Sequence, residues 1–112
     1  VWLMPAPNGF TIKPKEELIS IDLVQKVVSN YFNMKMSDLK VRRKYKGYVV
    51  PRQIAMYLSR KLTTASLLEI GEKFGGKDHS TVLHSIKKVE EKMVKEPPFR
   101  EMIENLQSRI KS

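Results

Sequence analysis

Apolar residues recur at helical spacing along most of the chain. The first set follows the i, i+3, i+4, i+7, i+8 pattern of an amphipathic helix and comprises Val24, Val27, Val28, Tyr31 and Phe32. Ser20 is the predicted N-cap of this helix, and Asp22 lies in its first turn, where the helix dipole favours a negative charge. No stretch of useful length alternates apolar and polar residues, so the pattern predicts an all-α domain.

The middle of the chain predicts two further helices. A very short one is expected at Ser37–Leu39. The next should begin at Pro51, because a missing N–H costs nothing at the first helical position. Val50 precedes the proline and should therefore be extended, and Gly47 should lie in a turn. The apolar face of this helix comprises Ile54, Ala55, Leu58 and Leu62.

Three more helices follow, and each has a recognisable boundary. The segment Ser66-Leu67-Leu68-Glu69 matches a capping box, and the helix that it begins should stop at Gly75-Gly76, where glycine can be left-handed. Asp78 is the predicted cap of the next helix, and Pro97-Pro98 should end it. Its inward face is Val82, Ile86, Val89 and Met93. The last helix is amphipathic through Phe99, Met102, Ile103, Leu106 and Ile110.

These elements predict one compact bundle of about six helices over residues 19–112. Residues 1–18 hold three of the six prolines and no periodic pattern, so we expect a linker or the tail of a preceding region. The sequence does not begin with methionine, as expected of a piece of a longer chain. It contains no cysteine, which excludes disulfides and thiolate metal sites, and no apolar run long enough to cross a bilayer.

The charge of the chain points to a polyanionic partner. The net charge is +9, from 21 Lys and Arg against 12 Asp and Glu. From Leu39 to Leu68 there is no carboxylate, whereas a solvated surface normally mixes both signs. The cations of that stretch are Lys40, Arg42, Arg43, Lys44, Lys46, Arg52, Arg60 and Lys61.

The helices on either side of Gly75-Gly76-Lys77 match the short glycine-containing turn of a helix-turn-helix, although the same pattern fits an ordinary helical hairpin. The outward face of the second helix favours the former, because a recognition helix presents its first turn to base edges. That face carries Ser80, Thr81, His84, Lys87 and Lys88, with Lys77, Asp78 and His79 at its amino end. Hydroxyl, imidazole and carboxylate groups can bond base edges, and the lysines suit phosphates. The backbone amides at the start of the 66–74 helix, at Ser66 and Leu67, also suit a phosphate.

The basic segment Lys40–Lys46 has two interpretations. It is either a solvated loop or a cationic arm that enters a narrow A·T-rich minor groove, whose negative potential attracts Arg and Lys. Tyr45 and Tyr48 are expected to cover the edge of the core rather than to stack on bases.

Catalysis and metal binding have little support. His79 and His84 are five residues apart on a helix, which does not align them as ligands, and neither has a carboxylate at ligand spacing. No phosphate-binding glycine loop or paired-carboxylate site is present, so we expect neither an enzyme nor a cofactor in this chain.

Three segments are specific enough to resemble a known family. They are Pro51-Arg52-Gln53-Ile54-Ala55-Met56-Tyr57-Leu58, Ser66-Leu67-x-Glu69-Ile70-Gly71, and the run from Phe74 through Gly75-Gly76-Lys77-Asp78-His79-Ser80-Thr81-Val82-Leu83 to His84. Together with Ile21-Asp22-x-x-Gln25-Lys26-x-Val28 they resemble the C-terminal DNA-binding domain of the bacterial replication initiator DnaA, from about Ile19 to Ile110. The resemblance implies a Trp repressor-like helix-turn-helix that recognises short, asymmetric DnaA boxes at the replication origin.

The resemblance also implies roles for individual residues. Asp78, His79 and Ser80 would contact bases in the major groove. Residues that would hold or orient on the DNA backbone are Lys77, Thr81, His84, Lys88, Arg52 and Gln53. The basic loop, with Arg43, Lys44 and Lys46, would enter the minor groove. ATP and Mg²⁺ would belong to an AAA+ domain upstream in the parent protein, whose motifs are absent from these residues.

Four positions depart from the family pattern. Lys77 stands where arginine is usual, and Ser80 where threonine is frequent, which removes a bidentate fork and a methyl group. Leu68 stands where proline is common. Lys44 occupies the position of the minor-groove arginine, and Arg43 beside it could substitute, so both remain candidates for that role.

The expected partner is double-stranded DNA, bound by a monomer, because no heptad pattern supports a dimer. The resemblance leaves acidic phospholipids and regulatory proteins as further partners, and implies a cytoplasmic, nucleoid-associated location in a bacterium. Two alternatives use the same charge: an anionic-membrane-surface module built on the amphipathic helix at 23–32, and a basic module that binds structured RNA.

Overall fold

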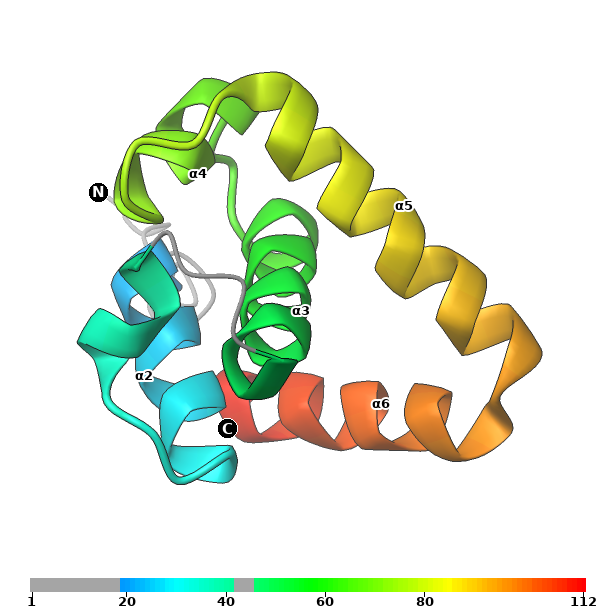
Figure 1. Cartoon of the computed structure of the whole chain (residues 1–112). Helices are drawn as coiled ribbons and strands as arrows, with labels where there is room; N and C mark the ends of the chain where they lie inside the picture. The colour runs from blue at the N-terminus through cyan, green and yellow to red at the C-terminus, as the bar shows by residue number, and fades with distance from the viewer. Residues whose placement is uncertain (1–18, 42–45) are drawn as a thin grey trace, which may run out of the picture.

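The computed structural model describes residues 19–41 and 46–112, and within these ranges the chain is helical throughout its regular structure (Figure 1). The α-helices are α2 (Ile21–Tyr31), α3 (Lys46–Leu62), α4 (Leu67–Lys73), α5 (His79–Lys95) and α6 (Pro97–Lys111). A short 3-10 helix, η1 (Met36–Lys40), lies between α2 and α3. The predicted all-α class is confirmed, and the number of helices is close to that expected. No described helix is long and apolar enough to span a membrane.

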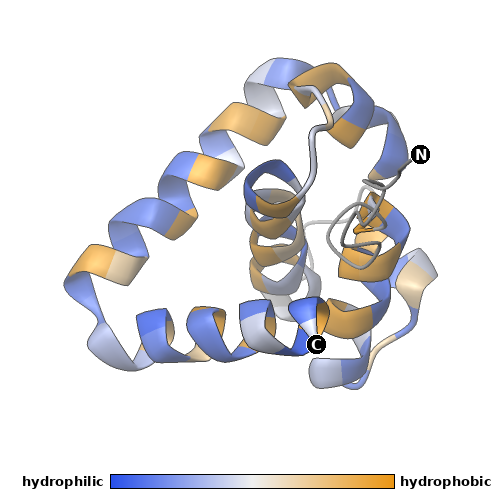
Figure 2. Ribbon diagram, turned by 180° about the vertical axis from the view of Figure 1, so that it is seen from behind, coloured by the Kyte–Doolittle hydropathy of each residue, from blue (hydrophilic) through white to orange (hydrophobic). Residues whose placement is uncertain are grey.

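Helix α3 is the centre of the fold, and α2, α4, α5 and α6 surround it (Figure 1). Its residues from Pro51 to Ser59 are buried on nearly every side, apart from the half-buried Gln53. Figure 2 shows hydrophobic residues along much of α3, whereas hydrophobic and hydrophilic residues alternate along α5 and α6. A helix that is apolar on most sides belongs in the interior, and the amphipathic helices cover it with their apolar faces.

The predicted start of α3 is wrong. The helix begins at Lys46, so Gly47 and Val50 are helical rather than in a turn or extended, and Pro51 lies inside the helix. Proline removes the amide that would bond the carbonyl four residues earlier, which here belongs to Gly47. Gly47 is exposed, so water can hydrate that carbonyl instead. Val50 packs against the core, and this contact outweighs the local preference of a residue that precedes proline.

Helix α2 begins where the sequence predicts. The Ser20 hydroxyl accepts a hydrogen bond from the Leu23 amide at 3.2 Å, and Val24 and Val28 are fully buried. The apolar face of α2 therefore belongs to the core, which removes the exposed amphipathic surface that a membrane-surface role would use. Tyr31 lies at the edge of this face and remains 37% exposed.

The break between α5 and α6 also follows the prediction. Helix α5 ends at Lys95, and Pro97 and Pro98 occupy the first turn of α6, where proline is tolerated. Four apolar residues of α6 are buried, namely Phe99, Ile103, Leu106 and Ile110. Helix α6 runs beneath α3 and ends beside α2, so it closes the core on the side opposite to α4 (Figure 1).

Candidate nucleic-acid interface

Helices α4 and α5 are joined by a turn whose geometry is set by backbone atoms. The Gly71 carbonyl accepts hydrogen bonds from the amides of Phe74, Gly76 and Lys77, at 3.2, 3.1 and 2.9 Å. The bond from Gly76 is the 6→1 bond of a Schellman C-cap. A Cβ on Gly71 would overlap the Lys77 carbonyl oxygen, so only glycine permits this approach. The predicted stop at Gly75-Gly76 is confirmed, with φ of 88° and 78°.

The amino end of α4 forms the predicted capping box. The Ser66 hydroxyl accepts from the Glu69 amide at 3.1 Å, and the Glu69 carboxylate accepts from the Ser66 amide at 2.9 Å. Among the described residues, no acceptor is found for the amides of Leu67 and Leu68. These two amides are available to an anion, although the Glu69 carboxylate reduces the positive potential around them.

The amino end of α5 is capped by Asp78. Its Oδ1 atom accepts from the Thr81 amide at 2.8 Å. This bond and a weaker interaction with the Ser80 amide stabilise the carboxylate and lower the pKa of Asp78 below its ordinary value. The side chains of the first turns of α5 project into solvent. The exposed residues of this surface are Asp78, His79, Ser80, Thr81, His84, Lys87 and Lys88.

Three other predicted DNA contacts have less exposed side chains than this group. The Nζ atom of Lys77 is buried, so its ammonium would have to turn outward to meet a phosphate. Gln53 is half-buried on α3. Arg52 is 8% exposed, and its guanidinium donates to the Val41 carbonyl at 2.9 Å. Burial lowers the pKa of Arg52, yet a guanidinium remains charged at any pH at which the protein is folded. The predicted DNA contact of Arg52 stays a prediction.

The structure describes only the two ends of the basic segment Lys40–Lys46. Arg43 and Lys44 lie outside the described residues, and Lys46 is the first residue of α3. Within the segment Lys40–Lys46, Lys40 is the exposed last residue of η1, and Val41 is half-buried. The choice between Arg43 and Lys44 for the minor groove therefore stays open.

Sequence reasoning missed two residues that hold α4 in place. Gln25 of α2 is fully buried, and its side-chain amide donates to the Lys73 carbonyl at the end of α4, at 2.9 Å. Gly71 permits the close packing of the turn. Both residues occur in the family-like motifs, but no local rule distinguishes a buried glutamine or an interior helical glycine from an exposed one.

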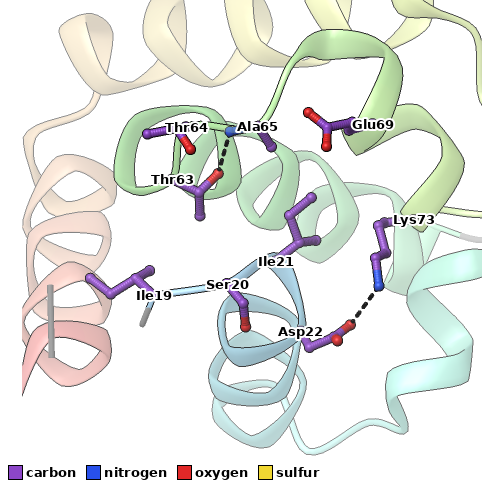
Figure 3. A pocket seen from close by; sticks show the side chains of 9 residues that line it. All are labelled: Ile19, Ser20, Ile21, Asp22, Thr63, Thr64, Ala65, Glu69 and Lys73. Carbon is purple, nitrogen blue, oxygen red and sulfur yellow. Dashed lines mark hydrogen bonds and ion pairs between the residues drawn. The ribbon is translucent and has the colours of Figure 1, made fainter. Parts of the chain in front are cut away.

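A pocket of about 240 Å³ lies between the start of α2, the α3–α4 connection and α4 (Figure 3). An ion pair between Asp22 and Lys73 crosses one side of it at 3.5 Å, and Glu69 and Thr63 also line it. It mixes both signs of charge, and none of the predicted DNA contacts lines it. No group of three potential metal ligands occurs in the described part of the chain.

An exposed polar recognition helix held by a tight turn on a small helical core defines a helix-turn-helix DNA-binding module. A model of the family described as "Bacterial dnaA protein helix-turn-helix" matches residues 21–89. The chain belongs to this family of DNA-binding domains, and it is therefore not itself an enzyme.

Related proteins agree with this assignment. Two that are named "Chromosomal replication initiator protein DnaA", from Geobacter sp. (strain M21) and Geotalea uraniireducens (strain Rf4), are each 46% identical over 99 residues. These matches cover 88% of this chain but 22% of each relative, so the chain spans about a fifth of their length. A solved structure described as "Crystal structure of DNA replication initiation factor" matches with a TM-score of 0.72 and 36% identity, over 88% of this chain and 30% of that one.

Proposed function

We propose that this chain binds short, asymmetric duplex sites of the DnaA-box type and serves initiation of chromosomal replication as the DNA-binding part of a longer protein. The relatives named as replication initiators support the biological role. One structural observation carries the DNA-binding mode: the capped first turn of α5 exposes a carboxylate, an imidazole and two hydroxyls next to one another. We further propose a cytoplasmic, nucleoid-associated location.

In this proposal the start of α5 lies in the major groove. The imidazole of His79 and the hydroxyl of Ser80 can each donate to or accept from a base edge. Asp78 accepts from the Thr81 amide through Oδ1, and a carboxylate has further lone pairs for a base amino group. The base contacts are therefore presented by a helix end whose conformation is already fixed before DNA arrives.

The remaining contacts go to phosphates and fix the register of α5 on the duplex. Thr81, His84 and Lys88 lie on one side of α5 and would follow one strand. The Leu67 amide would meet a phosphate at the start of α4, next to Ser66, whose own amide is engaged by Glu69, and Gln53 and an outward-turned Lys77 would add further contacts. The basic loop, through Lys46 and either Arg43 or Lys44, would enter the minor groove at an A·T-rich end.

The test separates residues that read bases from residues that hold the backbone. His79→Ala and Ser80→Ala should each weaken binding to a cognate box by about 1–3 kcal/mol and leave binding to a scrambled duplex little changed. Lys88→Ala should weaken both duplexes alike and reduce the salt slope of log Kd by about one. Fluorescence anisotropy titrations over a range of salt concentrations measure both quantities.

The matched control is Lys111→Ala. Lys111 is the exposed last residue of α6, a helix that runs along the side of the molecule opposite to α4 (Figure 1), so its loss should change neither the affinity nor the salt slope by a comparable amount. Equal losses on cognate and scrambled duplexes for both His79→Ala and Ser80→Ala would contradict the major-groove role of this helix end.

A further inference from the structure

The segment Lys40–Val41 is held directly against the helix-turn-helix. Gly75 lies in the turn between α4 and α5, and a Cβ at this position would overlap the carbonyl oxygen of Lys40. The Lys40 carbonyl carbon would lie only 3.0 Å from that Cβ. A close approach of two backbones at a residue with positive φ requires glycine for both reasons. The turn and the end of η1 therefore pack backbone against backbone.

Arg52 of the central helix binds the same segment through a hydrogen bond. Its guanidinium, on the buried face of α3, donates to the Val41 carbonyl at 2.9 Å. A charge-assisted hydrogen bond in a partly desolvated place is stronger than one between neutral groups. Residues 40 and 41 are thus fixed by the turn through Gly75 and by the central helix through Arg52.

This arrangement links the two parts of the proposed DNA surface. Val41 belongs to the basic segment Lys40–Lys46 and directly precedes residues 42–45, and Gly75 lies three residues before Asp78, which caps the helix proposed for the major groove. In Figure 1 the α4–α5 connection extends down to η1. The separation between the point where the basic loop begins and the start of α5 is therefore set by contacts within the protein.

We propose that Gly75 and Arg52 are positioning residues that hold the Lys40–Val41 segment against the helix-turn-helix, so that one domain reads both grooves of a box at a fixed spacing. The proposal rests on the proposed function, and it assigns Arg52 an indirect role in place of a phosphate contact. A rigid link of this kind contributes to specificity because a box is bound well only when its two halves match the spacing that the protein imposes.

The readout is the ratio of Kd values on two boxes, one with a G·C-rich end and one with an A·T-rich end. For the wild-type chain we expect a ratio on the order of ten, the usual effect of an unfavourable base step at a read position. Gly75→Ala should bring this ratio most of the way to one. The matched control is Gly76→Ala: Gly76 also has a positive φ, of 78°, but a Cβ there meets nothing within 4 Å. Gly76→Ala should therefore lower the melting temperature through backbone strain alone, by less than Gly75→Ala, and keep the wild-type ratio.

Arg52 is tested by Arg52→Met, which keeps much of the length of the buried side chain and removes the donor to Val41. It should lower the ratio while leaving the salt slope unchanged, and Arg52→Lys, which retains one donor, should restore part of the ratio. A direct phosphate contact would behave differently, because its loss weakens both boxes equally and reduces the salt slope by about one. This second pattern would overturn the positioning role of Arg52.

The outcomes separate the inference from the function on which it rests. If the wild-type chain distinguishes the two boxes but folded Gly75→Ala and Arg52→Met distinguish them equally well, the positioning role is wrong and the minor-groove contact stands. If the wild-type ratio is already near one, the minor-groove part of the proposed function is wrong and the inference fails with it. If Gly75→Ala does not fold, as judged by circular dichroism, Arg52→Met decides alone.

Discussion

Asp78 has two tasks at one place in the chain. Its carboxylate closes the first turn of α5 by accepting from the Thr81 amide, and the same side chain is exposed on the surface proposed to read bases. The helix end stabilises the negative charge through this hydrogen bond and through the helix dipole. Any substitution at this position therefore changes the folded state as well as the recognition of DNA.

The pKa of Asp78 leads to a prediction about stability. Because the pKa in the folded chain is lower than in the unfolded chain, the charged carboxylate stabilises the fold at pH values above its unfolded pKa of about 4. This contribution is lost as the pH falls through the folded pKa. The difference in unfolding free energy between the wild-type chain and Asp78→Asn, measured by urea denaturation, should therefore be larger at neutral pH than in acid. The same difference at every pH would show that the charge does not contribute.

At the residue scale, the burial of two long cationic side chains was not predicted from the sequence. The caps Ser20, Ser66 and Asp78 could be predicted because a cap is recognised within four residues of sequence. The burial of the Lys77 ammonium and the Arg52 guanidinium could not, because it depends on groups that only the fold brings near. For Arg52 that group is the Val41 carbonyl, eleven residues away in sequence.

The boundaries of the helices were predictable where neighbouring residues determine them, and not where tertiary packing does. The ends of α4, α5 and α6 lie where serine, glycine, aspartate and proline predict them, since these residues act on their own turn. The start of α3 was predicted wrongly, because Val50 gains more from packing on the core than it loses by preceding Pro51. The same holds for the candidate site, of which one part was predictable from local sequence and another was not. The exposed face of α5 was predictable from its period, whereas the contact of Gly75 with Lys40 joins two elements and leaves no local pattern.

Helix α4 is short, and its stability should depend on its capping box. It has only seven residues, too few to be stable without packing and capping. Ser66→Ala removes the acceptor of the Glu69 amide and should lower the unfolding free energy by about 1 kcal/mol. Ser66→Thr retains the hydroxyl and should cost clearly less in the same urea titration. An unchanged stability for the alanine variant would mean that tertiary packing alone holds α4.

Charge is distributed unevenly over the whole molecule. The carboxylates of the C-terminal part gather along the second half of α5 and the first half of α6, and comprise Glu90, Glu91, Glu96, Glu101 and Glu104. The stretch without carboxylates, Leu39–Leu68, includes the central helix and the start of α4. Lysines and an arginine lie among those glutamates and partly balance their charge, whereas the cations of Leu39–Leu68 are unbalanced within that stretch. The field of such a molecule favours approach of the Leu39–Leu68 part to a polyanion.

The domain should bind its site as a monomer. The apolar faces of α5 and α6 are used within its own core, and the large apolar residues exposed in the described ranges are few: one on α2, one on α4 and two on α5 that are eleven residues apart. These residues are Tyr31, Leu68, Leu83 and Val94. Sedimentation velocity of the chain with a duplex that holds one box should therefore show one chain per duplex. Two chains on a single box, at concentrations near Kd, would contradict this expectation.

The backbone construction of the α4–α5 turn has a consequence for how the domain can diverge during evolution. The turn is closed by amides that converge on the Gly71 carbonyl and by the absence of a side chain on Gly71. The side chains of His79 and Ser80 take no part in it, so mutations there can alter which bases are preferred without changing where the helix stands. Only Asp78 takes part both in capping α5 and in the proposed contacts with bases. A lineage could thus explore new binding sites at positions 79 and 80 at little risk to folding, while change at position 78 would be slow.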